Sequence, residues 1–401
     1  MPTINPEILR WARETAGLTP SRAAYALGIK DTKKVRAVDR ISALESGEQQ
    51  PSRPLLLRMT QKYRRPLLTF YLEAPPKRAD RGEDFRSIPD RQTGSESLVD
   101  ALVRDVRARQ STVRDILLDD EDHQTLKFVG SSSMYDGAGV VLDAIRSVLR
   151  LDISEYRAQK TPEIAFNLLR SRVEAAGIFV LLIGNLGSHH TAINVEAFRG
   201  FALADDVAPF IIINDQDAVT AWSFTLVHEL AHLWLGKTGV SGRSPDLQIE
   251  KFCNDVAAAF FLPEDELSEV GVTQNTTSEK TRDRIEAFAS ARHISRSMVA
   301  YSLYRADLIS DATWKTLSAW FLAQWRKGRD ARRERQKDAQ GGPNYYTVRR
   351  HRLGTALMQL VARSINGGTL TPTRASKILG VKPRSVAPLL NPSSSMGGRA
   401  A

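Results

Sequence analysis

The sequence predicts a multi-domain protein with an all-α N-terminal domain, an α+β domain and a helical C-terminal region. At 401 residues the chain is two to three times as long as an ordinary domain of about 150 residues. Short helical patterns fill the first 72 residues, and strand-like apolar runs follow only in the middle, at 177–184 and 209–214. Helical patterns then resume and continue to residue 390.

The composition is that of a soluble globular protein, with 42% hydrophobic and 25% charged residues. The apolar runs are far shorter than the roughly 20 residues that span a bilayer. The start of the chain, MPTINPEILRWARE, carries charges and lacks the apolar segment of a secretory signal. We therefore expect a cytoplasmic protein that does not contact membranes. A single cysteine, Cys253, excludes an internal disulfide and a cysteine-based zinc cluster.

The net charge of +10 is unevenly distributed. Residues 1–72 and residues 325–352 each carry a net charge of +7, and the rest of the chain sums to −4. Two basic zones around a near-neutral centre favour contact of these zones with a polyanion such as DNA. The alternative is that the charge only promotes solubility, and a solvated linker fits 325–352 as well as phosphate contact does.

The N-terminal domain, residues 1–73, is predicted to contain four or five short helices. Thr19 is a good N-cap for the second helix, and Gly28 ends it. The third helix is predicted to begin at Lys33 or Lys34. A turn marked by glycine between the second and third helices is typical of a helix-turn-helix.

A linker rich in proline and charge is predicted over 74–95, and the next domain over 96–310. After a helical lead-in, this domain contains an amphipathic helix, a small sheet and two helices, at 217–235 and 250–262, which make an α+β unit. The remaining residues, 311–401, are predicted to be a basic helical region that ends in a disordered tail.

The chemistry-bearing motif is His228-Glu229-Leu230-Ala231-His232, inside the predicted helix 217–235. Histidines at i and i+4 share one helical face and can both reach one tetrahedral Zn²⁺ at about 2.0–2.1 Å. Glu229 is then placed to act as the general base for a water that attacks a carbonyl. A hydrolytic zinc site also needs a third protein ligand.

Glu250 is the candidate third ligand, because it opens a second helix, EKFCNDVAAAFFLP, that can run antiparallel to the first. Asn254 shares its helical face and is expected to support a ligand histidine through a hydrogen bond. Cys253 is expected to be a small buried core residue, the alternative being a zinc-binding or redox-sensitive thiolate. The alternative for the whole group is a solvated histidine pair with Glu250 as a surface charge.

The segments FTLVHELAHLWLG and IEKFCNDVAAAFFLP resemble the ImmA/IrrE family of metallopeptidases. Upstream, GIFVLLIG, EAFRGFAL and PFIIIN are similar to that family's strands, and the N-terminal segment that begins ILRWARETAGLTPSRAAYALGI resembles an XRE-type helix-turn-helix. The resemblance covers roughly residues 5–310. It implies a gluzincin-like fold and a zinc-dependent endopeptidase of a kind that often cleaves a transcriptional repressor.

The resemblance implies that His228 and His232 are the first two zinc ligands, Glu229 the base and Glu250 the third ligand. Phe252 stands where family members often carry a second acid, which favours Glu250 as the ligand. The helix-turn-helix departs from the pattern through an apparent insertion, DTKKVRAV, before RISALESG.

Basic residues cluster around the predicted recognition helix and are the candidate DNA contacts: Lys33, Lys34, Arg36 and Arg40. Such side chains bind phosphates or guanine edges, and the alternative is a solvated helix face. XRE-type domains often pair, so the same resemblance implies a homodimer.

Two further features have two interpretations each. His189 and His190 are expected to form an ordinary polar turn, the alternative being a place beside the zinc. Arg199 either binds a substrate carboxylate or anchors a turn.

Two functional hypotheses of different class follow. The first is a zinc endopeptidase that acts as an intracellular regulator by cutting a protein partner or itself and is coupled to DNA binding. The second is a transcription regulator or antitoxin whose peptidase-like domain is a sensor or interaction module without turnover. A weaker third option is a metal that only stabilises the fold.

Overall fold

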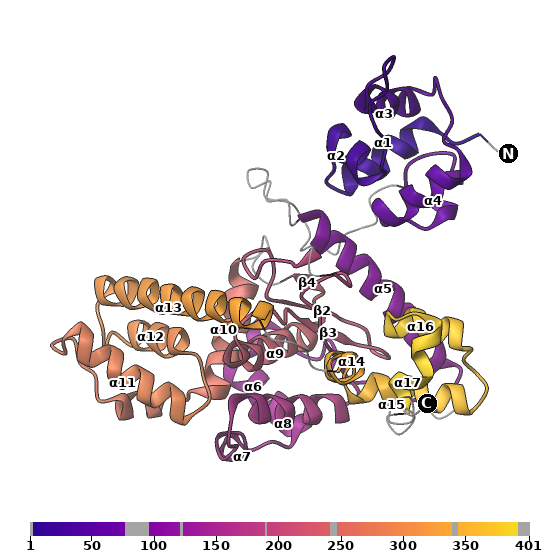
Figure 1. Cartoon of the computed structure of the whole chain (residues 1–401). Helices are drawn as coiled ribbons and strands as arrows, with labels where there is room; N and C mark the ends of the chain where they lie inside the picture. The colour runs from indigo at the N-terminus through magenta and orange to yellow at the C-terminus, as the bar shows by residue number, and fades with distance from the viewer. Residues whose placement is uncertain are drawn as a thin grey trace, which may run out of the picture.

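A small sheet with helices on both of its faces lies at the centre of the molecule (Figure 1). The computed structural model describes residues 3–76, 96–120, 123–188, 191–240, 247–338 and 344–391. The strands are β1 (Phe179–Leu182), β2 (Gly200–Leu203), β3 (Phe210–Ile213) and β4 (Gly239–Val240). Their order is β1-β3-β2-β4, with β1 parallel to β3 and β2 antiparallel to both β3 and β4. None of the described helices combines the length and apolarity needed to cross a membrane.

The sheet is buried on both faces, as its continuous apolar runs predict. Because successive strand residues point to opposite sides, Phe179 and Leu181 of β1 enter one core, whereas Val180 and Leu182 enter another. The other central strands alternate in the same way. The sheet therefore separates two hydrophobic cores.

The first core lies on the face covered by α9, and we call it the α9-side core. Its helices surround the predicted 217–235 and 250–262 helices, which the structure confirms as α9 (Val219–Trp234) and α10 (Leu247–Phe261). The other elements on this side are η2 (Met134–Asp136), α6 (Ala138–Leu149), α7 (Ile153–Arg157), α8 (Pro162–Ala175), η4 (Glu264–Val270), α11 (Ser278–Ala291), α12 (Arg296–Arg305) and α13 (Asp311–Asp338).

The second core, the α5-side core, lies on the opposite face and joins segments far apart in the sequence. Helix α5 (Glu96–Leu118) contributes Val99 and Leu102, and the C-terminal helices contribute Leu353 and Leu357. The predicted boundary at residue 310 therefore does not separate two cores, because residues after 344 complete the core that begins at α5. These C-terminal elements are α14 (Tyr345–Leu353), α15 (Thr355–Asn366), α16 (Pro372–Leu379), η5 (Pro383–Ser385) and α17 (Val386–Leu390).

The first 72 residues form a helical unit with a core of its own, which lies above α5 in Figure 1. A buried ion pair ties its first helix to its third, since Arg13 donates to Glu45 through Nε at 2.6 Å and Nη2 at 2.9 Å. Thr19 caps the second helix by accepting from Arg22 N, as the sequence predicts. The elements are α1 (Pro6–Thr15), α2 (Pro20–Ala26), α3 (Ala37–Ser46), α4 (Arg53–Lys62) and η1 (Leu67–Tyr71).

The predicted start of the third helix at Lys33 or Lys34 is wrong. Helix α3 begins at Ala37, whose backbone N–H donates to Asp31 Oδ1 at 2.6 Å. That bond satisfies an open donor of the first turn and fixes the helix start near the end of the insertion, which spans residues 31–38. The connection from α2 is therefore ten residues, 27–36, against the three or four of a typical helix-turn-helix.

Two predictions concern residues whose structure is not described. Most of the predicted linker, 77–95, and the predicted disordered tail, 392–401, lie outside the described residues. The basic zone 325–352, for which a solvated linker is one interpretation, is helical as far as 338, within α13.

Candidate metal centre

The centre is built where α10 packs against α9. Helix α9 is buried along most of its length, and Gly236 follows its last turn with a φ of +64°, a conformation that favours glycine. The apolar neighbours Leu226, Val227 and Leu230 belong to the α9-side core, so the helix cannot rotate its histidines to the surface. His228 and His232 are accordingly 5% and 1% exposed.

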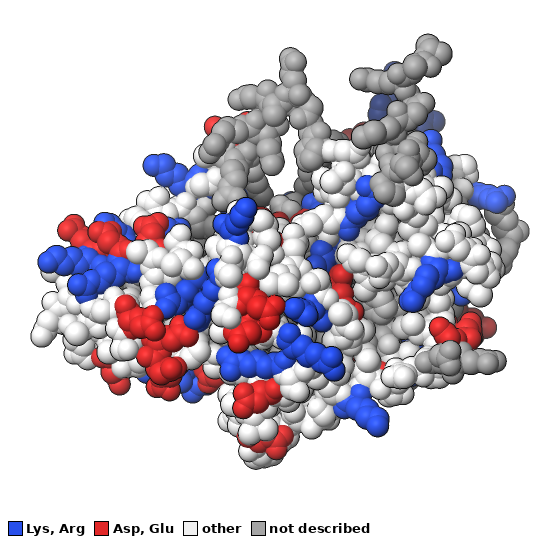
Figure 2. Space-filling view, turned by 90° about the horizontal axis from the view of Figure 1, so that it is seen from below, with Lys and Arg blue, Asp and Glu red and all other residues white. Residues whose placement is uncertain are grey.

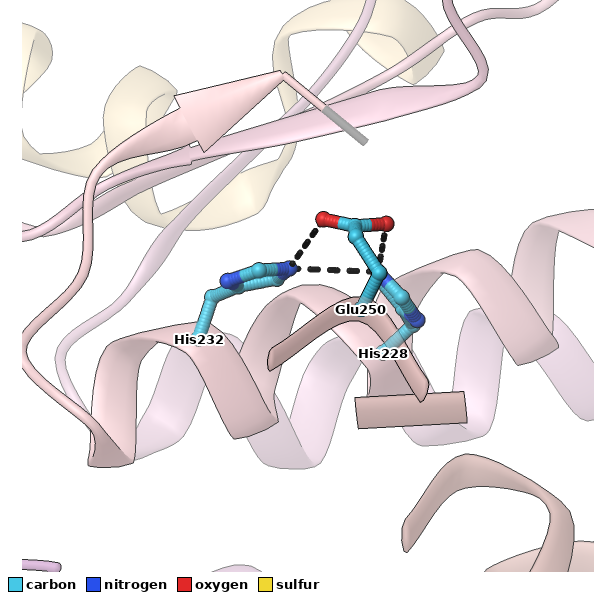
Figure 3. A group of neighbouring side chains, drawn as sticks. All are labelled: His228, His232 and Glu250. Atoms are coloured by element: carbon cyan, nitrogen blue, oxygen red, sulfur yellow. Dashed lines mark hydrogen bonds and ion pairs between the residues drawn. The ribbon is translucent and has the colours of Figure 1, made fainter. Parts of the chain in front are cut away.

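Three donor atoms converge on one point in the space between the helices (Figure 3). The Nε2 atoms of His228 and His232 lie 3.2 Å apart. Glu250 places Oε1 3.3 Å from His232 Nε2 and Oε2 3.6 Å from His228 Nε2. No other described histidine, cysteine, aspartate or glutamate forms a group of three with such a spacing.

These spacings fit a metal ion. Nitrogen and oxygen ligands about 2.0–2.1 Å from a tetrahedral ion lie about 3.3–3.4 Å from one another. The three separations, 3.2 to 3.6 Å, lie close to that value, with each histidine facing a different oxygen of the Glu250 carboxylate. Two imidazole nitrogens that face each other and a carboxylate form an environment that a central cation stabilises.

The electrostatics of the group agree with a site for a cation. Burial acts to lower the pKa of His232, but its hydrogen bonds with Cys253 and Glu250 prevail and raise that pKa well above 6.5. Burial acts to raise the pKa of Glu250, but both imidazoles prevail and hold it well below its usual 4.5. The carboxylate therefore stays ionised, and a proton on His232 is the competitor that a metal ion must displace.

Glu229 is fully buried beside the histidines, and a glycine makes room for it. A Cβ on Gly200 of β2 would lie 2.8 Å from Glu229 Oε1 and 2.5 Å from Thr225 Cγ2. Only the absence of a side chain at residue 200 allows α9 to approach the strand this closely. Gly200 is a site residue that the motif does not reveal, although a lone glycine within a strand-like run is a signal of close approach.

A cleft of about 480 Å³ opens beside the donor atoms, with His228 and Glu250 in its wall. The segment before β2 contributes Phe198, and α12 contributes Met298 and Tyr301. The α12 residues were missed by sequence reasoning, because nothing in their local pattern marks a helix that folds back onto the histidines. The cleft is large enough to receive several side chains of a peptide.

The remaining predicted residues occupy different places. Asn254 is exposed and lines the cleft, and it does not support a histidine, because neither Nδ1 has a hydrogen-bond partner in the described part of the chain. Arg199 lines the cleft and also pairs with Asp217 at 3.1 Å, so it anchors the turn after β3. Cys253 is fully buried, as expected, and interacts with His232. The predicted turn at 189–190 lies outside the described residues.

The predicted DNA contacts lie in the N-terminal unit, away from this centre. Lys33 and Lys34 are in the α2–α3 connection, Arg36 is the N-cap of α3, and Arg40 lies on α3. All four are exposed. Arg36 is partly engaged, since its guanidinium donates two hydrogen bonds to Asp39, each 2.9 Å long.

Comparison with known families places this centre in a peptidase-like domain. The model of the IrrE N-terminal-like domain, peptidase family M78, matches residues 186–304. The match runs from before β2 to α12 and includes all three donor residues. It supports the resemblance to ImmA/IrrE peptidases for this part of the chain, and the N-terminal unit lies outside it. No curated protein and no solved structure matches the chain.

Proposed function

We propose that the protein is a zinc-dependent endopeptidase that acts as an intracellular regulator by hydrolysing a peptide bond in a protein partner, such as a transcriptional repressor. The observation that carries the proposal is the convergence of His228, His232 and Glu250, at separations that suit zinc, beside an open cleft. A His₂Glu set is typical of hydrolytic zinc sites, which keep one coordination position for water or substrate.

The residues divide the work as follows. Zinc, when bound, supplies Lewis acidity to the attacking water and the scissile carbonyl. Glu229 takes the proton of the water on its carboxylate and gives it to the leaving amine. Phe198, Phe224 and Met298 give the cleft apolar walls that receive the peptide and exclude bulk water.

Glu229→Gln is the test of this mechanism. The variant keeps the three ligands, so we expect it to retain zinc, whereas cleavage falls by about 100-fold or more because the base is lost. His232→Ala should lose both zinc and cleavage. The substrate is sought by pull-down with Glu229→Gln, followed by incubation of the captured protein with wild type. Cleavage at the wild-type rate by Glu229→Gln would sink the mechanism.

The N-terminal unit supports a second function, DNA binding coupled to the peptidase or acting without it. Four basic side chains are exposed on and before α3, whereas the face in Figure 2 shows Lys and Arg interspersed with Asp and Glu. Polyanion binding requires an excess of one sign of charge, which the basic side chains at α3 supply and the face in Figure 2 does not. In this alternative, the peptidase-like domain is a sensor or interaction module.

Binding to the gene's own promoter separates the two functions. The alternative expects specific, salt-sensitive binding that survives His232→Ala and is lost on substitution of Lys33, Lys34 and Arg40 by Gln. Absence of specific binding at low salt would remove it. Cleavage of a captured partner by an N-terminally truncated chain would show that the peptidase function does not depend on DNA binding by the N-terminal unit.

A further inference from the structure

A second cavity, of about 830 Å³, lies on the α5 side of the sheet, away from the metal centre. Its walls come from the N-terminal unit, helix α5, the residues that follow β1, and α14. Seven arginines line it, against two aspartates, and one of the seven, Arg352, pairs with Asp215 outside the lining at 2.6 Å. Such an excess of fixed positive charge around one cavity is costly, because arginine remains ionised at all ordinary pH values.

Several of these guanidinium groups have donors without an acceptor among the residues that the structure describes. Arg109 is 8% exposed and donates from Nη2 to Asp105 at 2.6 Å, but within the described residues no acceptor is in reach of its Nε or Nη1. Arg349 donates from Nη2 to two carbonyl oxygens of the α16 terminus, and its Nε has no acceptor there. Arg65 donates from Nη2 to Thr15, and its buried Nε has no acceptor within the described residues.

The guanidinium groups also lie close to one another. A Cβ on Gly380 would come within 2.5 Å of Arg109 Nη2 and 2.7 Å of Arg349 Nη2, so both groups reach the same glycine. Burial, followed by repulsion from Arg109, lowers the pKa of Arg349. Burial, followed by repulsion from Arg104, lowers the pKa of Arg65 to about 10. Like charges are held together here. A bound anion would offset their repulsion and would accept hydrogen bonds from the donors that have no partner.

We propose that this cavity binds a phosphorylated small molecule, a multivalent anion of nucleotide size. Guanidinium groups bind phosphate oxygens through charge-assisted hydrogen bonds, and Nε and Nη1 of Arg109 each offer a donor for one such bond. The volume lies within the range of small-ligand sites and exceeds what a single inorganic anion fills. A ligand here would touch Trp11 and Thr15 of the N-terminal unit together with α5 and α14, and so would link that unit to the rest of the molecule.

Isothermal titration of the full-length protein with ATP, pyrophosphate and inorganic phosphate tests the proposal. We expect saturable one-to-one binding of ATP or pyrophosphate, weaker binding of phosphate, and at least tenfold weaker binding in Arg109→Gln and in Arg349→Gln. Arg109→Lys keeps the charge but not the separate Nε and Nη1 donors, so its affinity should lie between those of Arg109→Gln and wild type. Arg22→Gln, which removes an exposed cation of the N-terminal unit, should bind as wild type does.

Circular dichroism establishes whether each variant is folded. If Arg109→Gln and Arg349→Gln do not fold, Arg104→Gln, at a half-buried residue of the cavity wall, replaces them in the binding experiment. No binding of any of the three probes to wild type would overturn the proposal. Equal binding by wild type and the cavity variants would also overturn it, because the anions would then bind elsewhere. An equal loss in Arg22→Gln would identify non-specific attraction to a basic protein.

Discussion

The two faces of the sheet bury charge in opposite ways. On the α9 side, two imidazoles and one carboxylate converge, so that a single divalent cation would balance the group. On the α5 side, seven arginines gather with fewer carboxylates, and among the described residues buried donors of Arg65, Arg109 and Arg349 have no acceptor. The contrast indicates that buried charges in this fold are arranged for ligands of opposite sign, a cation on one face and an anion on the other.

A third buried charge shows what a purely structural arrangement looks like. Arg170 of α8 is 5% exposed, yet each of its three guanidinium nitrogens donates a hydrogen bond. Its Nε pairs with Glu174 Oε1 at 3.1 Å, and its Nη atoms donate to the carbonyl oxygens of Val180, His351 and Arg352. Glu174 in turn accepts from the first backbone N–H groups of α15. Arg170 therefore joins the two faces, and the protein itself supplies a partner for each of its nitrogens.

The largest expected effect is the loss of metal on removal of a ligand. Purified wild-type protein should contain about one equivalent of zinc, and His232→Ala close to none, because two remaining ligands do not hold the ion. Mass spectrometry of the metal content measures it, and His123→Ala, at an exposed histidine, is the matched control. Equal zinc in wild type and His232→Ala would place the metal elsewhere.

The next effect compares two buried arginines. Arg170→Met should destabilise the protein by about 3–5 kcal/mol, because it leaves Glu174 buried without its cation. Arg109→Met should change stability by less than about 1 kcal/mol without added anions, since its partner Asp105 is half-exposed and returns to water. Urea denaturation followed by circular dichroism measures both. A cost for Arg109→Met equal to that of Arg170→Met would show that Arg109 is structural.

Much of the fold on the α9 side could be predicted from the sequence, because its signals are local. The histidine pair sits four residues apart on one helix, and Glu250 opens the next helix, so periodicity alone brings the candidates near one another. The buried strands β1 and β3 likewise follow from unbroken apolar runs.

The α5 side could not be predicted, because it depends on contacts between distant segments. Arg109 and Arg349 are 240 positions apart and meet only because α14 returns to pack beside the sheet. The start of α3 was predicted too early for a related reason, since Asp31, within the insertion, supplies the hydrogen bond that fixes it. Neither feature has a periodic pattern that reveals it.

A smaller effect is expected on substitution of Gly200, which tests whether close packing against β2 positions the proposed base, Glu229. Gly200→Ala brings a Cβ against Thr225 and Glu229, so we expect a loss of about 1–3 kcal/mol in stability. Cleavage should fall further than zinc content, since the new methyl group displaces the base and not the ligands. Gly139→Ala in α6, where a Cβ meets nothing within 4 Å, is the control. Unchanged cleavage in Gly200→Ala would mean that Glu229 is not held by this contact.

The smallest effect is the pH dependence of stabilisation by metal. In the metal-free protein, the raised pKa of His232 gives stability that is full below 6.5 and is lost as the pH rises through the raised value. The lowered pKa of Glu250 gives stability that is present above 4.5 and is lost as the pH falls through the lowered value. The metal-free centre is therefore most favourable between these limits, where His232 carries a proton beside an ionised Glu250.

Zinc must displace the proton from His232, so the apparent affinity for zinc increases as the pH rises. The difference in Tm between zinc-loaded and chelator-treated protein should therefore widen by several degrees from about pH 5.5 to about pH 8. Differential scanning calorimetry measures the difference, which should stay near zero in His232→Ala at every pH. A difference that stays constant or narrows as the pH rises would show that no histidine proton competes with the metal. The metal would then bind at a place other than His228, His232 and Glu250.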